Sequence, residues 1–324
     1  MKTVLLSAPY MIPYVERFRP VFSHYGLNLI VPEVLERMEE DHLLQHAGQF
    51  DGAICGDDRY TAKVMEACQP RLKVISKWGT GIDSLDQKAA ARWGIQIRNT
   101  PNAFTLPVSD SVLGYMLAFA RRQPWMDAEM KAGNWEKLMG RSLSECTLGV
   151  IGVGNVGKAV LRRARAFGMR LLGNDIRPIE PDFIVEQGVE MVSLAVLMAQ
   201  SDFISVNCDL NPTSYHLIND ASLANVKRGA VLINTARGPI VEEAALVRAL
   251  QDGRLGGAGM DVFEVEPLPL DSALRQMSQV MLAPHNSNSS PSAWERVHWN
   301  TIRNLLLGLE INCEDLDEVR ASLS

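Results

Sequence analysis

The chain has 324 residues, of which 47% are hydrophobic, and it carries a formal net charge of −6. That length suggests two domains of ordinary size, and that composition excludes a largely disordered protein. The acidic balance, with no basic block among interleaved aromatic residues, argues against a protein that binds nucleic acid.

The cysteine spacing and the first residues indicate the compartment. The five cysteines are an odd number without a Cys-x-x-Cys pair; they are Cys55, Cys68, Cys146, Cys208 and Cys313. This pattern argues against a disulfide framework or a zinc site and for a reducing compartment. The apolar start is interrupted by Ser7 and Pro9, which favours a buried strand over a signal peptide, and no stretch approaches the length of a membrane span. We therefore expect a soluble, cytoplasmic protein with no bound metal.

Apolar strand-like runs alternate with helix-like runs from the first residues onward. This alternation predicts a parallel sheet with helices on both faces. The first hundred residues contain predicted strands at 4–7, 27–31, 52–55, 74–77 and 95–97, with helices at 15–24 and 88–93. A long helix is predicted at 108–122, after the Pro-containing stretch 99–107.

The alternation restarts near residue 148. Predicted strands follow at 149–152, 171–174, 203–207, 231–234, 257–262 and 280–283. A last long helix is predicted at 293–309, after an Asn- and Ser-rich stretch. The restart predicts an α/β protein with two doubly wound domains rather than one large sheet. The two long helices are expected to cross between the domains, so that the C-terminal helix completes the first domain and the second is inserted.

A Gly-x-Gly-x-x-Gly motif opens the second series. Its glycines, Gly152, Gly154 and Gly157, lie between a predicted strand and a predicted helix at 158–167. In this context the first glycine permits a tight turn, the second lets the backbone approach a pyrophosphate, and the third allows close helix packing. The helix N terminus then presents unpaired amides to the phosphates. The alternative is a set of glycines that serves only a tight turn, and the flanking strand and helix favour nucleotide binding.

An acidic residue, Asp175, follows the next strand at the distance expected for a dinucleotide site. Its carboxylate should accept hydrogen bonds from the adenosine ribose and repel a 2′-phosphate. NAD is therefore expected as the cofactor in preference to NADP, although Arg177 lies close enough in sequence to weaken that preference.

Four residues with reactive or charged side chains follow predicted strands in the second half: Arg237, Asp261, Glu266 and His285. A fixed cation suits a substrate anion, and a histidine can give a proton to a developing alkoxide, so the set suits reduction of a 2-keto acid. Each residue alone has an ordinary alternative, such as a solvated side chain or a Glu-Pro turn. Their joint order with the glycine motif favours the catalytic interpretation.

The sequence resembles the D-isomer-specific 2-hydroxyacid dehydrogenases over nearly its whole length. Besides the glycine motif, the resemblance rests on segments in the family's order: 77–83, 99–101, 233–238, 261–263, 266–267 and 284–285. It implies a flavodoxin-like substrate domain at 1–100 and 291–324 and an inserted NAD-binding Rossmann domain at 101–290. It also implies hydride transfer in a cleft between the two domains.

The resemblance also implies residue roles. Arg237 binds the substrate carboxylate or polarises the carbonyl, His285 exchanges the proton, and Glu266 hydrogen-bonds the imidazole and favours its protonated form. Asp261 resembles the acid that contacts the nicotinamide carboxamide. The implied cofactor contacts are Gly152, Gly154, Asn155, Val156, Gly157, Asp175, Asn207, Cys208, Thr235, Ala236, Arg237, Asp261 and His285. The implied substrate contacts are Lys77, Trp78, Gly79, Thr80 and Arg237.

The substrate remains open at this point. D-3-phosphoglycerate dehydrogenases resemble the chain at 79–83 and bind the substrate phosphate with arginines on loops. Here Lys77 occupies one of those arginine positions, and we infer that Gly56 occupies another. Asp57 and Asp58 would repel a phosphate unless Arg59 compensates. Two further departures concern Trp78, where a small residue is frequent, and Asn207, where many relatives have a histidine. Trp78 would narrow the pocket or stack on the cofactor.

Other functions within the same architecture are less favoured. An NAD(H)-sensing corepressor would need peptide-binding surfaces that the sequence does not reveal, and formate or phosphite dehydrogenases act on other anions. The preferred hypothesis is an NAD-dependent dehydrogenase of a small D-2-hydroxy acid. The resemblance implies a homodimer, with contacts at 108–122 and 133–138.

Overall fold

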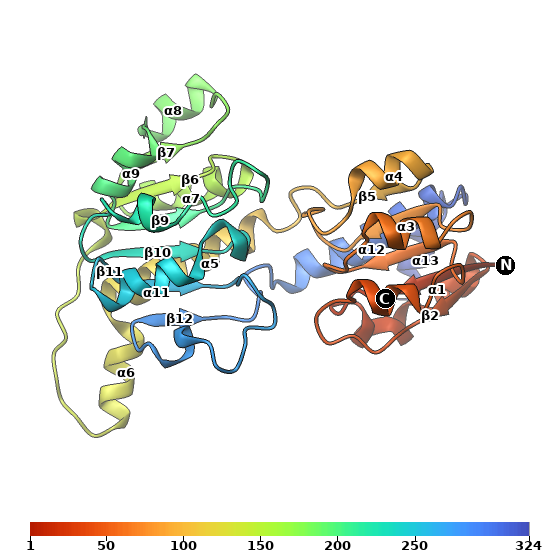
Figure 1. Cartoon of the computed structure of the whole chain (residues 1–324), viewed down its shortest axis with the longest axis horizontal. Coiled ribbons are helices and arrows are strands. Elements are labelled where there is room, and N and C mark those ends of the chain that lie inside the picture. The colour runs from red at the N-terminus through yellow and green to blue at the C-terminus, as the bar shows by residue number, and fades with distance from the viewer. Residues whose placement is uncertain (324) are drawn as a thin grey trace. The chain divides into compact units, whose positions relative to one another are not determined.

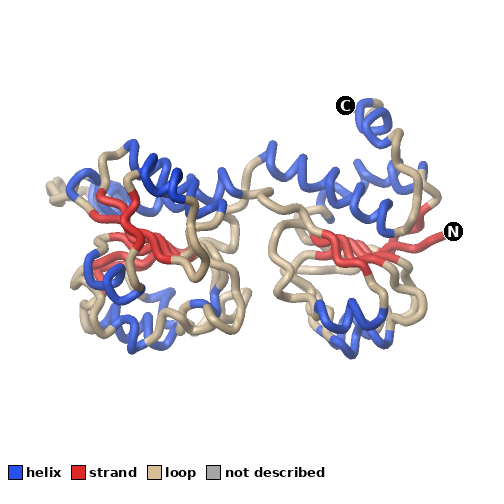
Figure 2. The backbone as a smooth tube through the Cα atoms, turned by 90° about the horizontal axis from the view of Figure 1, so that it is seen from above, coloured by secondary structure: helices blue, strands red, loops and turns tan. Residues whose placement is uncertain are grey.

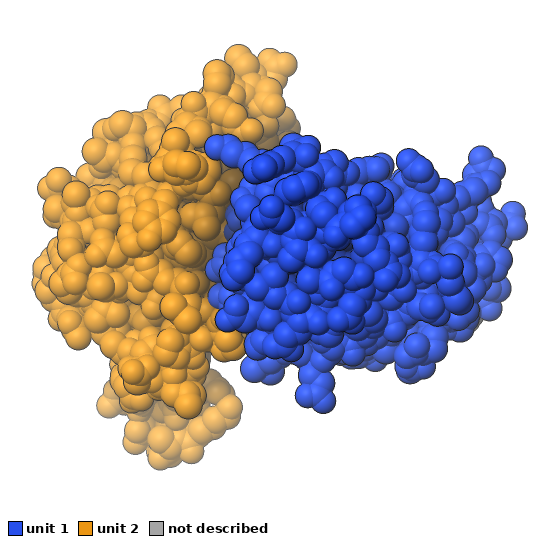
Figure 3. Space-filling view, turned by 45° about the vertical axis from the view of Figure 1, so that its right-hand side comes forward, with its two compact units in different colours: residues 1–103, 290–324 blue, residues 104–289 orange. Residues whose placement is uncertain are grey.

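The computed structural model describes residues 1–323, and these form two compact units (Figure 3). Unit 1 comprises Met1–Ala103 and Ser290–Ser324, and unit 2 comprises Phe104–Ser289. The chain thus leaves unit 1 once, builds unit 2 and returns.

Unit 1 is a five-stranded parallel sheet in the order β2-β1-β3-β4-β5. Figure 1 labels the two edge strands, β2 and β5. Its strands are β1 Lys2–Leu6, β2 Leu27–Ile30, β3 Gly52–Cys55, β4 Val74–Lys77 and β5 Gln96–Arg98. Its α-helices are α1 Val15–His24, α2 Glu40–Leu44, α3 Ala62–Ala67, α4 Gln87–Trp93, α12 Pro291–Gly308 and α13 Leu316–Ala321, with a 3-10 turn η1 at Ile12–Tyr14. This strand order is the flavodoxin-like one, as expected.

Helices cover both faces of each sheet (Figure 2). Burial on both faces explains the apolar runs in the sequence, since every residue of β3, β4 and β9 is buried. It also leaves the loops at the carboxyl ends of the strands as the accessible places for ligand binding.

Unit 2 is a seven-stranded parallel sheet in the order β12-β11-β10-β9-β6-β7-β8. Its strands are β6 Thr147–Ile151, β7 Arg170–Asn174, β8 Val189–Met191, β9 Phe203–Val206, β10 Ala230–Asn234, β11 Leu255–Met260 and β12 Val280–Leu282. Its α-helices are α5 Thr105–Arg121, α6 Gln123–Lys131, α7 Asn155–Ala166, α8 Pro181–Gln187, α9 Leu194–Gln200, α10 Asp220–Leu223 and α11 Glu243–Gln251, and its 3-10 turns are η2 Leu143–Glu145, η3 Gly238–Ile240 and η4 Ala273–Gln276. The strand order reverses between β6 and β9, and such a switch point is where open α/β sheets bind dinucleotides.

Two expectations about the long helices and the strand count need correction. Each long helix lies wholly in one unit, α5 in unit 2 and α12 in unit 1, so the loops before them make the crossings. The short strand β8 was not predicted, so Asn207 follows the fourth strand of unit 2 rather than the third. Within residues 1–323, no helix combines the length and apolarity needed to cross a bilayer.

Candidate active site

The glycine motif forms the turn between β6 and α7 at the switch point of unit 2. Gly152 has φ +86, and a Cβ there would lie 2.5 Å from the amide nitrogen of Cys208. A Cβ on Gly157 would lie 2.1 Å from the carbonyl oxygen of Gly152. A Cβ on Gly154, by contrast, would meet no atom within 4 Å. The first and third glycines are therefore required by the chain's own packing, and the second leaves an open backbone surface that fits a pyrophosphate.

Asp175 follows β7, and its carboxylate accepts a hydrogen bond from the backbone of this turn. One carboxylate oxygen accepts from the amide of Val153 at 2.8 Å, and the other accepts from the amide of Arg177 at 2.8 Å. The Asp175 side chain is only 6% exposed, whereas that of Arg177 is 72% exposed and its Nε lies 3.9 Å away. Because each carboxylate oxygen has a second lone pair, Asp175 can still accept from a ribose hydroxyl.

Two buried oxygens without a hydrogen-bond partner lie at the ends of neighbouring strands β9 and β10. They are Oδ1 of Asn207 and Oγ1 of Thr235. The Asn207 amide group donates to Ser205, which fixes the direction of its oxygen. An unsatisfied buried polar atom costs roughly 1–3 kcal/mol, so these two positions are suited to a polar ligand. With the open backbone at Gly154, they show that unit 2 fits a dinucleotide.

Arg237 follows β10 in an extended conformation and begins the turn η3. Its Nη1 donates to the carbonyl of Ala236 at 2.9 Å, and Asn234 Nδ2 donates to the carbonyl of Arg237 at 2.9 Å. A Cβ on Gly238 would lie 1.9 Å from the carbonyl carbon of Phe263. Only glycine permits this approach, which packs the Arg237 turn directly against the turn that carries Glu266.

His285 follows β12, and its ring pairs with Glu266. Nδ1 of His285 lies 2.9 Å from Oε2 of Glu266, while Oε1 of Glu266 accepts from the amide of Phe263 at 2.9 Å. The two side chains are 17% and 15% exposed. Because Nδ1 pairs with the carboxylate, the Glu266 side chain fixes the orientation of the ring, and Nε2 is the nitrogen we assign to proton exchange.

Asp261 fixes the backbone of the histidine loop. Its carboxylate accepts from the amides of Asn286 at 2.8 Å and Ser287 at 2.9 Å, and its carbonyl accepts from the amide of His285 at 2.8 Å. Asp261 is 1% exposed. His285 has φ +50, an uncommon backbone conformation that these three bonds hold in place. The family resemblance implies a nicotinamide contact for Asp261, which stays a prediction; the structure shows that its carboxylate positions the histidine loop.

In unit 1, Lys77 is the last residue of β4 and the segment 78–80 follows it, but the charged end of the Lys77 side chain is buried. Its side chain is 5% exposed, and Nζ lies 2.9 Å from Oδ1 of Asp57. Nζ also donates to the carbonyl of Trp78 at 3.3 Å. An ammonium neutralised inside its own unit is poorly placed to bind a substrate anion. This geometry favours a structural role for Lys77 and leaves the backbone amides of the following residues as the ligand-binding groups.

Comparison with known proteins identifies the family. The model of the D-isomer specific 2-hydroxyacid dehydrogenase NAD binding domain matches residues 113–287. The chain belongs to this family. A glyoxylate reductase of Korarchaeum cryptofilum is 38% identical over 255 residues, which cover 77% of this chain and 76% of that protein.

Two further relatives extend the comparison. A D-3-phosphoglycerate dehydrogenase of Rattus norvegicus is 37% identical over 281 residues, which cover 86% of this chain but only 52% of that protein. A crystal structure of D-lactate dehydrogenase from Aquifex aeolicus, complexed with NAD and lactic acid, superposes with a TM-score of 0.84 at 25% identity, covering 98% of each chain. The predicted family, fold class, cofactor and reaction class are confirmed: this is an NAD-dependent D-2-hydroxyacid dehydrogenase that acts on small 2-keto acids.

This dehydrogenase carries a second histidine–glutamate pair that the sequence did not reveal. His216 Nε2 lies 2.5 Å from Oε1 of Glu264, on the same turn that carries Glu266. The amide of Glu264 donates to Glu243, whose carboxyl pKa is raised, chiefly by burial. His216 lies in no recognisable motif. The one sequence signal for this pair is the spacing of Glu264 and Glu266: they are two residues apart on the turn, and each pairs with a different histidine.

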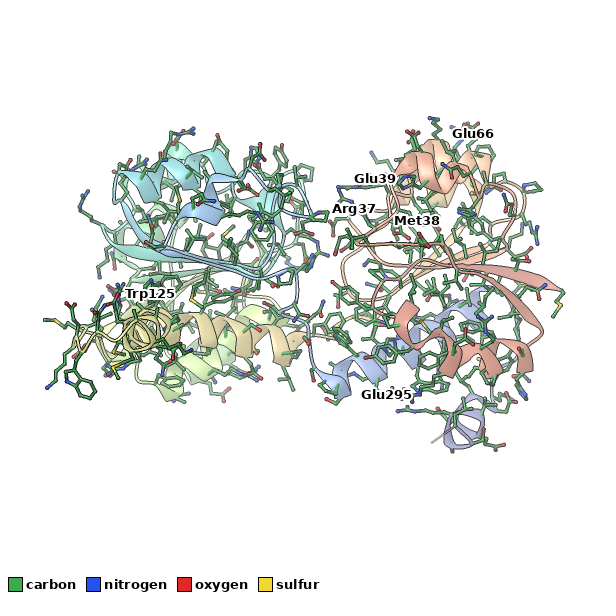
Figure 4. All side chains as sticks on the ribbon, turned by 90° about the horizontal axis from the view of Figure 1, so that it is seen from below. Arg37, Met38, Glu39, Glu66, Trp125 and Glu295 are labelled. Atoms are coloured by element: carbon green, nitrogen blue, oxygen red, sulfur yellow. The ribbon has the colours of Figure 1, made fainter. Side chains whose placement is uncertain are left out.

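Beside Lys77, the dehydrogenase buries a carboxyl group whose ionisation should affect stability. Burial raises the pKa of Asp58 to about 6, although Ser7 Oγ and the amide of Met38 both donate to its carboxylate (Figure 4 labels Met38). The folded-state pKa thus lies above the unfolded value of 3.8. The stabilisation associated with protonated Asp58 is therefore complete below that unfolded value and is lost as the pH rises through about 6.

We expect Asp58→Asn to remove this pH dependence. Relative to the wild type, the variant should gain unfolding free energy as the pH rises from about 4 to about 7, because the amide cannot ionise. Urea unfolding at several pH values measures the difference. Asp51→Asn is the control, and its pH dependence should have the opposite sign. Partial burial acts to raise the pKa of Asp51, but the hydrogen bonds from Arg71 and from the amide of Thr3 outweigh it and lower the pKa. Parallel pH curves for wild type and Asp58→Asn would contradict the prediction.

Proposed function

We propose that this dehydrogenase reduces a small, unphosphorylated 2-keto acid, such as glyoxylate or hydroxypyruvate, with NADH. The observation that carries the proposal is the arrangement at the ends of the three neighbouring strands β10, β11 and β12. They present Arg237, Asp261 and His285 in turn, with the His285–Glu266 pair already formed at 2.9 Å. A cation, a proton donor and the acid that anchors its loop are thereby gathered at one edge of one sheet.

In the proposed mechanism, Arg237 and His285 act on the substrate, and Glu266 acts on the ring of His285. In unit 2, Arg237 binds the substrate anion by charge-assisted hydrogen bonds. In unit 1, we assign the backbone amides after β4 as donors to the substrate carboxylate. His285 donates its Nε2 proton to the carbonyl oxygen as negative charge develops there, and Glu266 stabilises the positive ring before the transfer. Bound NADH supplies the hydride that reduces C2 of the substrate. The neutral histidine then recovers a proton from solvent.

The proposed cofactor contacts follow the glycine motif and the unpaired oxygens. Gly154, with Asn155 and Val156 at the start of α7, offers amides to the pyrophosphate, and Asp175 accepts from the ribose. Asn207 and Thr235 supply the unpartnered oxygens for the nicotinamide half. The remaining proposed contacts are those of Gly152, Gly157, Cys208, Ala236, Arg237, Asp261 and His285.

The loops of unit 1 favour an unphosphorylated acid. Lys77 would be the cation for a phosphate, but Asp57 neutralises it at 2.9 Å, and Asp58 adds a further buried carboxyl group beside the pair. A dianionic phosphate would meet no net positive charge in this cluster. A D-3-phosphoglycerate dehydrogenase is therefore the second candidate.

Initial rates of NADH oxidation against a panel of 2-keto acids test the proposal. Glyoxylate, hydroxypyruvate, pyruvate, 2-oxoglutarate and 3-phosphohydroxypyruvate make up the panel. The highest kcat/KM is expected for one of the small unphosphorylated acids. A preference for 3-phosphohydroxypyruvate would overturn the substrate assignment, and silence across the panel with NADH still bound would favour a nucleotide-sensing protein.

The same assay with NADPH tests the role of Asp175. NADH is expected to be preferred, and Asp175→Ala should lower the ratio of kcat/KM for NADH to that for NADPH by about tenfold, because it removes the charge that repels a 2′-phosphate. The variant also loses the bond to the Val153 amide, so NADH binding itself should weaken. Asp182→Ala, in the first turn of the nearby helix α8, is the control. An unchanged cofactor ratio would remove Asp175 from cofactor selection.

We further propose a homodimer in a reducing compartment such as the cytoplasm. All five cysteines are free, and four of them are buried, which agrees with a reducing environment. Large apolar side chains are exposed around 133–138: Met130 at 52%, Trp135 at 81% and Met139 at 93%. Exposed apolar groups of this size are typical of a subunit contact.

The homodimer makes a prediction for light scattering. The molar mass measured for the wild-type protein should be twice that of its chain. Trp135→Ser should shift the population toward the monomer, because it removes a large apolar side chain from the contact. Tyr215→Ser, which removes an aromatic side chain that is 59% exposed elsewhere in unit 2, is the control. A monomeric wild-type protein at assay concentrations would contradict the proposal.

A further inference from the structure

Trp78, the large residue in the proposed substrate-binding segment, is held by a histidine far away in the sequence. Its indole Nε1 donates to Nδ1 of His298 at 2.9 Å, across 220 positions of the chain. Trp78 is 2% exposed and His298 is 3% exposed. The indole is therefore packed beneath the segment and does not form a solvent-facing wall.

Aromatic rings enclose this bond on several sides. The Trp78 ring stacks on Tyr10 with centroids 4.8 Å apart and an interplanar angle of 24°. Trp294 meets the Trp78 ring edge-on at 5.8 Å. Trp294 and His298 lie four residues apart on α12, so one face of that helix supports the indole through both contacts. The ring has little freedom to move.

The ionisation of His298 suits its acceptor role. Burial lowers the pKa of His298 to about 4; of the smaller effects, the charge of Glu295 raises this pKa and the charge of Arg17 lowers it (Figure 4 labels Glu295). The ring is therefore neutral near pH 7, and its Nδ1 has the lone pair that the indole N–H requires. The remaining ring nitrogen, Nε2, carries the proton.

The same helix also contacts, through Thr100, the backbone that follows Trp78. The carbonyl of Gly79 accepts from the amide of Thr100 at 2.8 Å, and Thr80 Oγ1 donates to the carbonyl of Thr100 at 2.9 Å. Asn300 of α12 donates to Thr100 Oγ1 at 2.8 Å. The segment 78–80 is thus fixed at one end through the indole and at the other through Thr100, with Gly79 at φ +119 between them.

We propose that His298 is a positioning residue for the substrate: by holding the Trp78 indole, it sets the direction of the backbone amides at 79–80 that bind the substrate carboxylate. The inference rests on the proposed function, which assigns carboxylate binding to this segment. His298 does not touch the substrate. Its loss acts on substrate affinity and leaves the proton transfer at His285 and the binding of NADH unchanged.

Three variants test the bond itself. Trp78→Phe keeps a ring but removes the donor, and His298→Phe keeps a ring but removes the acceptor. Each is expected to raise KM for the best acid of the panel about tenfold, the size of one hydrogen bond of about 1.4 kcal/mol, with kcat and the Kd for NADH changed less than about twofold. His298→Asn, whose side-chain oxygen can accept in place of Nδ1, should restore much of the wild-type KM.

The double variant Trp78→Phe/His298→Phe completes a mutant cycle, and His24→Phe is the control on an exposed histidine of unit 1. The double variant should be no worse than either single variant, because both remove the same bond. Additive effects, an unchanged KM in folded Trp78→Phe, or an His298→Asn variant as impaired as His298→Phe would overturn the proposal and leave only a packing role. If His298→Phe fails to fold, Trp78→Phe and His298→Asn still decide the matter.

Gly79→Ala separates this inference from the function on which it rests. Alanine at φ +119 strains the segment and must redirect its amides. If Gly79→Ala raises KM while Trp78→Phe and His298→Phe do not, only the role of His298 fails. If all three variants leave KM unchanged, the segment does not bind the carboxylate, and that part of the proposed function fails.

Discussion

Replacing His285 with glutamine is expected to lower kcat by about 10²- to 10⁴-fold, while the Kd for NADH changes little. Glutamine can still accept or donate a hydrogen bond near Glu266, but it cannot deliver a proton to the carbonyl oxygen. The backbone of the loop should survive, because its conformation depends on Asp261, which bonds the amides of His285, Asn286 and Ser287. Stopped-flow hydride transfer and fluorescence titration of NADH measure the two quantities separately.

Companion variants separate catalysis from folding. His24→Gln, on an exposed histidine that also pairs with a carboxylate, should leave kcat unchanged. Glu266→Gln keeps a hydrogen-bonding group opposite Nδ1 but removes its charge, so a smaller loss than that of His285→Gln is expected. A folded His285→Gln enzyme with near-normal kcat would exclude His285 from proton transfer.

The sequence predicted much of the fold because parallel strands buried on both faces leave continuous apolar runs. The strand at 74–77 and the helix at 15–24 have the predicted bounds in the structure. The strand β8 escaped prediction, since three residues, Val189–Met191, at the edge of a sheet make no pattern. The helix α5 begins at Thr105, before the predicted start, because Pro107 is tolerated in the first turn where its missing amide has no partner to lose.

The site was predictable where chemistry follows the ends of strands, and less so where tertiary contacts decide. Glycines, Arg237 and His285 lie in local motifs, and parallel strands bring their ends to one edge of the sheet. The inward turn of Lys77 and the bond between Trp78 and His298 depend on which side chains meet after folding. No local pattern encodes a contact across 220 residues, so the roles of these side chains required the structure.

Replacing Arg237 with glutamine is expected to reduce kcat/KM for the 2-keto acid by about 10²- to 10³-fold. The guanidinium is the cation that follows β10, and its turn is fixed by Asn234 and by the close packing of Gly238 on Phe263. A neutral amide in that framework loses the charge that binds the carboxylate and stabilises the developing alkoxide. Arg237→Lys keeps the positive charge but cannot form the bidentate hydrogen bonds of a guanidinium. Its kcat/KM should therefore lie between those of the wild type and Arg237→Gln.

Arg248→Gln is the matched control, because this arginine of unit 2 is half-exposed and pairs with Asp220 on the surface. Its kcat/KM should equal that of the wild type. Added guanidinium should partly restore Arg237→Gln, since the small cation can occupy the space that the side chain leaves, and should not affect the control. If Arg237→Gln keeps kcat/KM within about threefold of the wild type, the anion is held elsewhere, and the backbone amides at 79–80 must supply more of the binding than the charge of Arg237 does.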